Sequence, residues 1–338
     1  MGSVKKYDLI DLMKFIGSIM IIAMHMAALE DISVSAHFYG IQLITRWAVP
    51  FFFVTSAFFL YRKSNGEPNW EKTKGYVKRI LILYGVWFGL NIVSIIYKLY
   101  CAGFGSVSTW LIFLRNLTTG SVYTAAWYLL ASAFGALFVY WLAKRFSEKT
   151  VLAITLVIYG ICTITSTYKG IFPAEITQWI GTYIGSTCNN IICGCFYFAL
   201  GRSIAKHYDA LIQIPTKVCW VLLVLSYGLF YGEIILLKHL EILGTTDASL
   251  LLIPVALFLF LLVAKSNLSI KSAPYFRKMS TFIFCSQGTV NLAGCLAAKV
   301  MGIPFTYVEF LCSIALMMIL GSALIWLQKK IKWLNYLT

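Results

Sequence analysis

Apolar segments of about 20 residues recur along almost the whole of this 338-residue chain. A helical segment of that length crosses the hydrocarbon core of a bilayer. Only 12% of the residues are charged, compared with roughly 25% in a soluble domain. We therefore expect an all-α integral membrane protein, a bundle of about ten transmembrane helices that forms a single domain over residues 1–338. The apolar runs are 8–30, 38–61, 78–99, 123–143, 150–168, 186–205, 217–237, 247–265, 279–298 and 304–328.

The positions of lysine and arginine predict the orientation of this bundle. Of the 28 basic residues, 21 fall on one set of loops and ends, five on the opposite set, and Lys14 and Arg46 inside the runs. Because cytoplasmic loops carry the excess of basic residues, both termini are predicted to be cytoplasmic. The formal charge of +15 is thus assigned to loops at the bilayer, and no nucleic-acid partner is expected. The 21 residues are Lys5, Lys6, Arg62, Lys63, Lys72, Lys74, Lys78, Arg79, Lys144, Arg145, Lys149, Arg202, Lys206, Lys217, Lys265, Lys271, Arg277, Lys278, Lys329, Lys330 and Lys332.

Nine cysteines raise the question of disulfides or a metal. No C-x-x-C pair repeats, no histidine stands at ligand spacing, and most of the cysteines lie inside apolar runs, where a free thiol behaves as a small apolar group. We expect no metal site. The first apolar run carries Lys14 and His25, is longer than the core of a signal peptide and lacks a cleavage site, so it is predicted to remain as the first span.

The longest connection on the outer side, residues 101–123, contains the apolar segment Trp110–Leu114. This segment is too short to span a bilayer. It predicts an interfacial or re-entrant helix over the outer mouth of the bundle, with a plain amphipathic loop helix as the alternative.

The first run carries a stripe of polar residues. At about 100° per residue, Asp11, Lys14, Ser18 and His25 fall within an arc of roughly 60°, so the stripe should face the inside of the bundle. His25 lies about 16 Å along the axis from Lys14. An ionisable group inside a span suggests a functional site, and a histidine suits a general base or an acyl carrier. The alternative is a histidine that only packs against a neighbouring helix.

Arg46 in the second run is expected at the depth of that histidine. It can clamp an anion, polarise a carbonyl, or pair with a carboxylate such as Glu309 or Glu233. The segments 51–53 and 56–57, aromatic and small respectively, are expected to contact lipid and to allow close helix packing.

Two of these segments resemble the bacterial membrane acyltransferase family 3. Its first-span pattern is a basic residue, ten further positions and a histidine, and Lys14 and His25 stand at that spacing, with lysine in place of the commoner arginine. Its second-span pattern resembles residues 46–61, where Ala57 replaces the usual glycine. The resemblance covers residues 8 to about 205 well and the last third weakly. Weaker matches are 78–87, 127–130 and 196–201.

This resemblance implies an O-acyltransferase of the bacterial cytoplasmic (inner) membrane. The donor would be acyl-CoA, most often acetyl-CoA, and the acceptor a hydroxyl of a cell-envelope sugar, glycan or lipid-linked intermediate. His25 would take the acceptor proton or carry the acyl group, and Arg46 would stabilise charge on the thioester oxygen. Asp11, or a carboxylate from another span, would orient the stripe that includes Lys14. A homodimer is left open.

The basic inner loop is expected to hold the CoA phosphates, through Lys72, Lys74, Lys78 and Arg79. The ordinary excess of basic residues in cytoplasmic loops is the alternative explanation for each of them.

One position departs from the family. Where relatives often carry histidine, this chain has Gln287, which can form hydrogen bonds but cannot exchange a proton. The chain also resembles the membrane half of the vancomycin-resistance serine racemases. That likeness implies a second function, a transport module for serine or another small amino acid, in which Arg46 would bind the substrate carboxylate and Asn189 and Asn190 would line the pathway.

Overall fold

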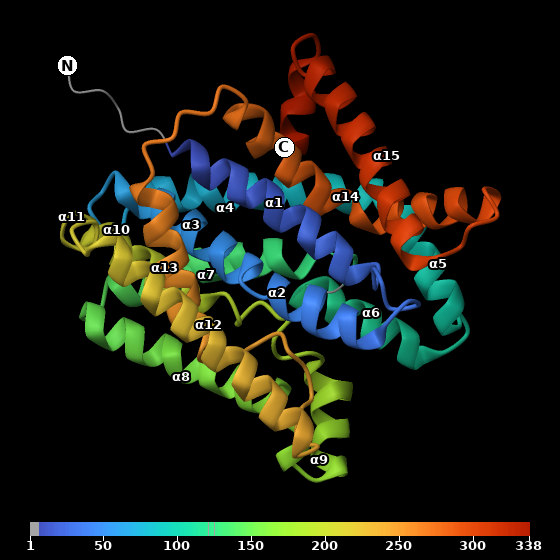
Figure 1. The fold of residues 1–338 in the computed structure, drawn as a ribbon, viewed down its shortest axis with the longest axis horizontal. Helices are drawn as coiled ribbons and strands as arrows, with labels where there is room; N and C mark the ends of the chain where they lie inside the picture. Colours follow the sequence, from blue (N-terminus) through green and yellow to red (C-terminus); the bar gives the residue numbers. More distant parts are fainter. Residues whose placement is uncertain (1–6, 121, 125) are drawn as a thin grey trace.

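The computed structural model describes residues 7–120, 122–124 and 126–338, and every regular element in that part of the chain is helical. Figure 1 shows most of the long helices running roughly along one direction, with α15 leaning away from the others. The elements are α1 (Asp8–His25), η1 (Ala36–Gln42), α2 (Leu43–Thr45), α3 (Ala48–Arg62), α4 (Trp70–Leu90), α5 (Ile92–Ala102), α6 (Val107–Thr119), α7 (Ala126–Ala143), α8 (Glu148–Ser166), η2 (Lys169–Ile171), α9 (Ala174–Trp179), η3 (Ile180–Ile184), α10 (Cys195–Lys206), α11 (Tyr208–Leu211), α12 (Thr216–His239), α13 (Leu252–Lys265), α14 (Ala273–Val300), α15 (Thr306–Leu327) and η4 (Lys332–Leu337).

The all-helical fold predicted from the apolar runs is confirmed. Among the described residues, six helices are long and apolar enough to cross a membrane, and seven if α4 and α5 form one bent span. Three predicted spans contain helices that are too short or too charged to be counted among these membrane-crossing helices. They are 8–30, 186–205 and 247–265. The count of ten spans and the side of the termini remain predictions.

Several of the loops that carry basic residues lie at one end of the bundle (Figure 1), which we call the basic end; the other is the opposite end. Lys206 lies 3.6 Å from Glu67 and 3.7 Å from Glu148, and Arg62 lies 3.1 Å from Asp209. These contacts join the loops that connect α3 to α4, α7 to α8 and α10 to α12, all of which lie at the side of the N-terminus in Figure 1.

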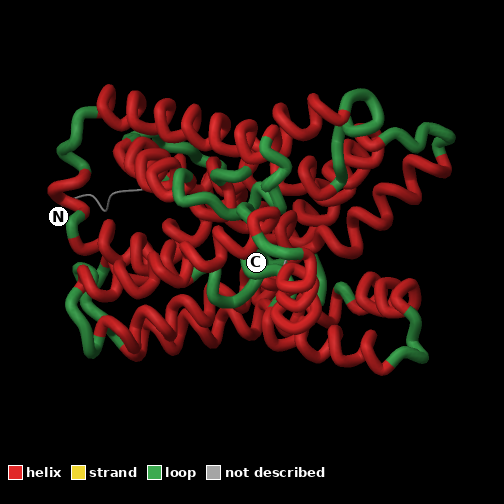
Figure 2. The backbone as a smooth tube through the Cα atoms, turned by 90° about the horizontal axis from the view of Figure 1, so that it is seen from below, coloured by secondary structure: helices red, strands yellow, loops and turns green. Residues whose placement is uncertain are grey.

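The predicted spans 186–205 and 247–265 are only partly helical. Residues 185–194 and 240–251 form loops at the opposite end, and α10 and α13 begin after them. Ser, Thr, Asn and Asp side chains in both segments bond to nearby backbone and so compete with helix formation. Irregular backbone within a membrane protein is tolerated where it lines a cavity, and Figure 2 shows green loop segments among the helices in the middle of the molecule.

A sharp bend of 64° separates α4 from α5. Asn91 stands at the break, fully buried, and its side-chain amide donates to the carbonyl of Cys285 at 3.1 Å. Its carbonyl oxygen accepts from the backbone of Thr289 at 3.1 Å. The predicted run 78–99 is therefore bent because a buried amide ties it to α14 instead of continuing the helix.

The aromatic run of α3 is not on the lipid face. Phe51, Phe52 and Phe53 are at most 4% exposed, so the expected lipid contact was wrong and the expected packing is confirmed. A β-carbon at Gly201 of α10 would meet the β-carbon of Ala57 at 2.6 Å, which shows how closely these two helices approach. The helix predicted within 101–123 is present as α6; its position relative to a bilayer remains a prediction.

Candidate active site

The opposite end of the bundle holds a cavity of about 60 Å³ beneath the two loops, which we call the outer cavity. It receives side chains from α1, from the break before α3, and from both loops. His25 and Arg46 both line it, so the two residues predicted to share a depth do meet. The other polar lining residues are Thr45, Thr124, Tyr159, Cys188, Asn189, Cys193, Tyr197 and Asp247.

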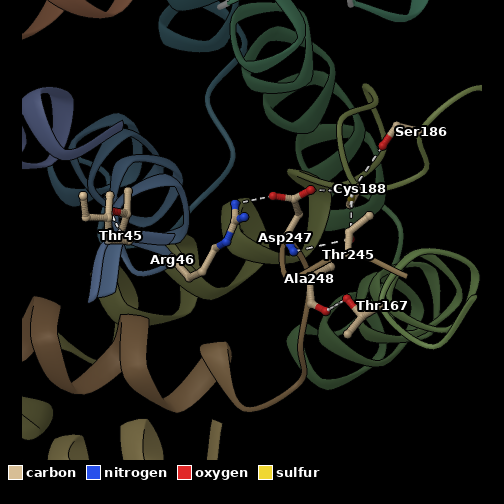
Figure 3. A network of polar contacts seen from close by, with 9 residues as sticks. Thr45, Arg46, Thr167, Ser186, Cys188, Thr245, Asp247 and Ala248 are labelled. Atoms are coloured by element: carbon tan, nitrogen blue, oxygen red, sulfur yellow. Dashed lines mark hydrogen bonds and ion pairs between the residues drawn. The ribbon is translucent and has the colours of Figure 1, made fainter. Parts of the chain in front are cut away.

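Arg46 forms an ion pair in this cavity, but not with either predicted carboxylate. Its Nη1 donates to Asp247 of loop 240–251 (Figure 3), and only 9% of the arginine side chain is exposed. Glu233 instead accepts from Tyr168 and Ser249, and Glu309 accepts from the thiol of Cys295 at 3.2 Å.

The Nε of Arg46 has no hydrogen-bond partner among the described residues and is fully buried. A guanidinium bonded on one edge and free on another is prepared for a second acceptor. Such an edge can bind a substrate oxygen that gains negative charge.

Loop 240–251 is fixed to the end of α8, which places Asp247 in the cavity. Thr167 donates to the carbonyl of Ala248, and its own carbonyl accepts from the backbone of Gly244 at 2.9 Å. A β-carbon at Gly244 would meet the carbonyl oxygen of Ser166 at 2.2 Å. Only glycine therefore allows this approach of the two backbones.

His25 ends α1 and faces the outer cavity. The residue is exposed as well as lining the cavity, and no described residue forms a hydrogen bond with its ring. A histidine that only packed against a neighbouring helix would be bonded or enclosed. The ring is instead available to a molecule in the cavity.

A second cavity of about 150 Å³, the inner cavity, lies nearer the basic end. Lys14 and Arg79 line it, together with Ser56, Tyr76 and Tyr128. Neither cation has an ion-pair partner among the described residues. Two cations without an ion-pair partner favour an anionic ligand here.

Asp11 does not orient His25. It accepts three hydrogen bonds from Arg277 of α14, the shortest at 2.7 Å, and its side chain is 9% exposed. Asp11 and His25 are about 21 Å apart along α1. The polar stripe is therefore divided: Asp11 fixes α1 to α14, Lys14 faces the inner cavity, and His25 faces the outer one.

The two cavities meet at a layer of four aromatic rings, Phe52, Phe53, Tyr128 and Phe284. Phe284 lines both cavities. Its ring centre lies 5.1 Å from that of Tyr128 and 6.0 Å from that of Phe52, and Tyr128 lies 4.6 Å from Phe53. This aromatic layer is the barrier between the two cavities.

Of the four residues predicted to hold CoA phosphates, the structure places only Arg79 on the inner cavity. Lys72, Lys74 and Lys78 lie earlier on α4 and do not line it. Gln287 is 1% exposed and donates to the carbonyl of Phe284 at 2.7 Å. It is not among the lining residues of either cavity.

Sequence reasoning missed Asp247, the loop cysteine Cys188 and the cavity roles of Tyr128 and Phe284. Asp247 carried a usable signal, since it is an acidic residue at the start of an apolar run, where such a group is costly. Within the part of the chain that the structure describes, no group of three or more His, Cys, Asp or Glu side chains is placed to hold a metal ion.

These features define a multi-pass helical membrane protein with two buried polar cavities. The model of the acyltransferase domain of acyltransferase family 3 matches residues 7–327, and the chain belongs to that family. It is 26% identical over 261 residues to a protein of Enterococcus faecalis named amino-acid racemase; the match covers 76% of this chain and 35% of that protein. A search of solved structures gives no match.

Proposed function

We propose that this protein moves an acyl group, in the simplest case acetyl, from acyl-CoA at the basic end to a hydroxyl at the opposite end. The observation that supports the proposal most strongly is the pair of cavities that meet at the aromatic layer. Lys14 and Arg79 in the inner cavity suit the donor's phosphates, and His25 in the outer cavity suits proton transfer.

The residues of the outer cavity fit the steps of acyl transfer. The acceptor oxygen attacks the thioester carbon, and His25 takes the acceptor proton as the new C–O bond forms. The free Nε edge of Arg46 stabilises the negative charge on the carbonyl oxygen. The C–S bond then breaks, and His25 returns the proton to the thiolate, which leaves CoA as the thiol and the ester as product.

The test is His25→Gln in protein reconstituted into vesicles with acetyl-CoA on one side. Glutamine keeps a hydrogen-bonding group but cannot carry the proton. Acyl transfer should fall by at least about 10²-fold, the contribution of a positioned base, while the melting temperature stays close to that of the wild type. Transfer at a near wild-type rate in the variant would disprove the assignment of His25.

A second candidate function, uptake of a small amino acid, has one specific observation in its favour. Arg46 and Asp247 lie side by side in the outer cavity, so they can bind the carboxylate and the ammonium group of a zwitterion, and the similar enterococcal protein is named an amino-acid racemase. Under this function, His25→Gln should keep most of the serine flux into vesicles. The same variant thus separates the two functions.

A further inference from the structure

A groove of about 340 Å³ lies between α5 and α6, at the opposite end of the bundle (Figure 1). α6 is the helix predicted within residues 101–123, and no step of the proposed acyl transfer uses it. Most of the residues that line the groove are apolar. They are Ile95, Leu99, Ala102, Ile112, Phe113 and Val122, and the polar ones are Lys98, Ser108, Thr109 and Asn116.

Little protein fills the space around α6. This helix packs closely against no other described helix, α5 included. Large apolar side chains of both helices are exposed: Val93 and Ile96 of α5, and Leu111 and Leu114 of α6, are 50–62% exposed. A group of exposed apolar side chains marks a surface that another molecule covers. In a chain with several membrane-crossing helices, the hydrocarbon of the bilayer is the matching partner.

Three aromatic rings gather at the turn between α5 and α6. The ring centre of Phe104 lies 6.4 Å from that of Tyr100 and 6.1 Å from that of Trp110. The indole nitrogen of Trp110 donates to the carbonyl of Phe104 at 3.0 Å. Trp and Tyr are enriched at the level of the lipid head groups. Lys98 lies one helical turn before the last residue of α5, about 6 Å along the axis, so its ammonium group can reach that level.

Two hydrogen-bond donors line the groove, one from each helix. Lys98 is the charged residue among the described lining residues, and it has no ion-pair partner within the described chain. The side-chain oxygen of Asn116 accepts from Nε of Arg115 at 3.2 Å and from its Nη2 at 3.1 Å, which leaves the Asn116 amide group to donate. A lysine alone selects no class of ligand. A lysine and an amide between apolar walls match a molecule with an anionic head and an aliphatic chain.

We propose that the groove between α5 and α6 binds one phospholipid that carries a net negative charge. Its phosphate accepts hydrogen bonds from Lys98 and Asn116, and one of its acyl chains lies against the apolar wall. The lipid thereby fills the space that the two helices leave between them. This assignment depends on neither acyl transfer nor transport, since it uses no residue of the outer or the inner cavity.

The test follows hydrogen exchange of residues 92–119 in the full-length protein, which is stripped of lipid in detergent. Phosphatidylglycerol, which is anionic, and phosphatidylcholine, which has no net charge, are added separately with the same acyl chains. Exchange in this segment should slow at a lower concentration of phosphatidylglycerol. Lys98→Gln should raise the half-maximal concentration of phosphatidylglycerol by roughly threefold to fivefold, the scale of one exposed ionic contact, and leave that of phosphatidylcholine unchanged.

Two further variants test the two parts of the site. Lys299→Gln is the matched control for the charge, since it removes an exposed lysine at the end of α14, outside the groove; it should change neither concentration. Ala102→Phe fills the groove from an exposed position, so neither lipid should slow exchange in that protein.

The wild type supplies a last measurement, because added salt should reduce only the effect of phosphatidylglycerol. Equal half-maximal concentrations for the two lipids would show nonspecific lipid contact and overturn the proposal. An unaffected Lys98→Gln protein, or no slowing of exchange by either lipid, would overturn it as well.

Discussion

The ion pair between Arg46 and Asp247 allows a quantitative test of how loop 240–251 is held. Removing one partner of a fully buried pair costs about 3–5 kcal/mol. The Asp247 side chain is 25% exposed, and the cavity of about 60 Å³ is large enough to admit water. Water can thus replace part of the lost contact, and we expect Asp247→Asn to cost about 1–2 kcal/mol of the free energy of unfolding.

Such a loss corresponds to a drop of roughly 1–3 °C in melting temperature for a chain of this size. The double variant Arg46→Gln with Asp247→Asn removes both charges, so it should lose less than the sum of the single variants, with a coupling energy of about 1–2 kcal/mol.

The exposed pair Arg62 and Asp209, with side chains 31% and 85% exposed, serves as the matched control and should give a coupling energy below about 0.5 kcal/mol. Thermal unfolding in detergent, followed by circular dichroism, gives all of these values. Additive effects of Arg46→Gln and Asp247→Asn would refute the inference that this pair holds the loop.

Three further predictions follow from the other features of the site. Lys14→Gln should raise the KM for acetyl-CoA more than it lowers kcat, whereas Lys14→Arg should change both values only slightly. An unchanged KM in the Lys14→Gln protein would contradict a role of Lys14 in donor binding. Phe284→Ala opens the aromatic layer, so it should let small ions leak across vesicles that the wild type keeps tight, and an intact seal would contradict the role of the ring. Because the Thr306 hydroxyl donates to Asp31 and holds the pKa of that carboxyl below its usual range, this contact stabilises the fold at neutral pH and is lost as the pH falls through the lowered pKa. The melting-temperature difference between wild type and Thr306→Val should therefore be present at pH 7 and disappear as the pH falls through the lowered pKa of Asp31; a difference that persists in acid would point to packing instead.

Much of the helical fold could be predicted from single runs, because apolar length and polar spacing are local properties. The stripe of the first run predicted that Lys14 and His25 face inward, and both line cavities. The positions at which the predicted helices break were not predictable from single runs. Asn91 bends its span because it bonds to Cys285, nearly 200 positions later, and no pattern within residues 78–99 specifies that partner.

In the candidate active site, too, single runs predicted the local features but not the contacts between distant segments. The depth of Arg46 followed from its place in a run, but its carboxylate did not, since Asp247 reaches it only after loop 240–251 folds onto α8. Glu233 and Glu309, the acids expected near the outer ends of helices, both have other partners. Partners across distant segments require the tertiary arrangement.

The aromatic layer has a consequence for which part of the proposed donor can cross the bundle. Four rings carry no formal charge, and the three phenylalanines among them are less than a tenth exposed, so a phosphate that passed between them would lose its hydration without gaining a counter-ion. An uncharged acyl thioester faces no such penalty. The layer would therefore act as a polarity filter, retaining the phosphorylated portion of the donor on one side and admitting its neutral tip.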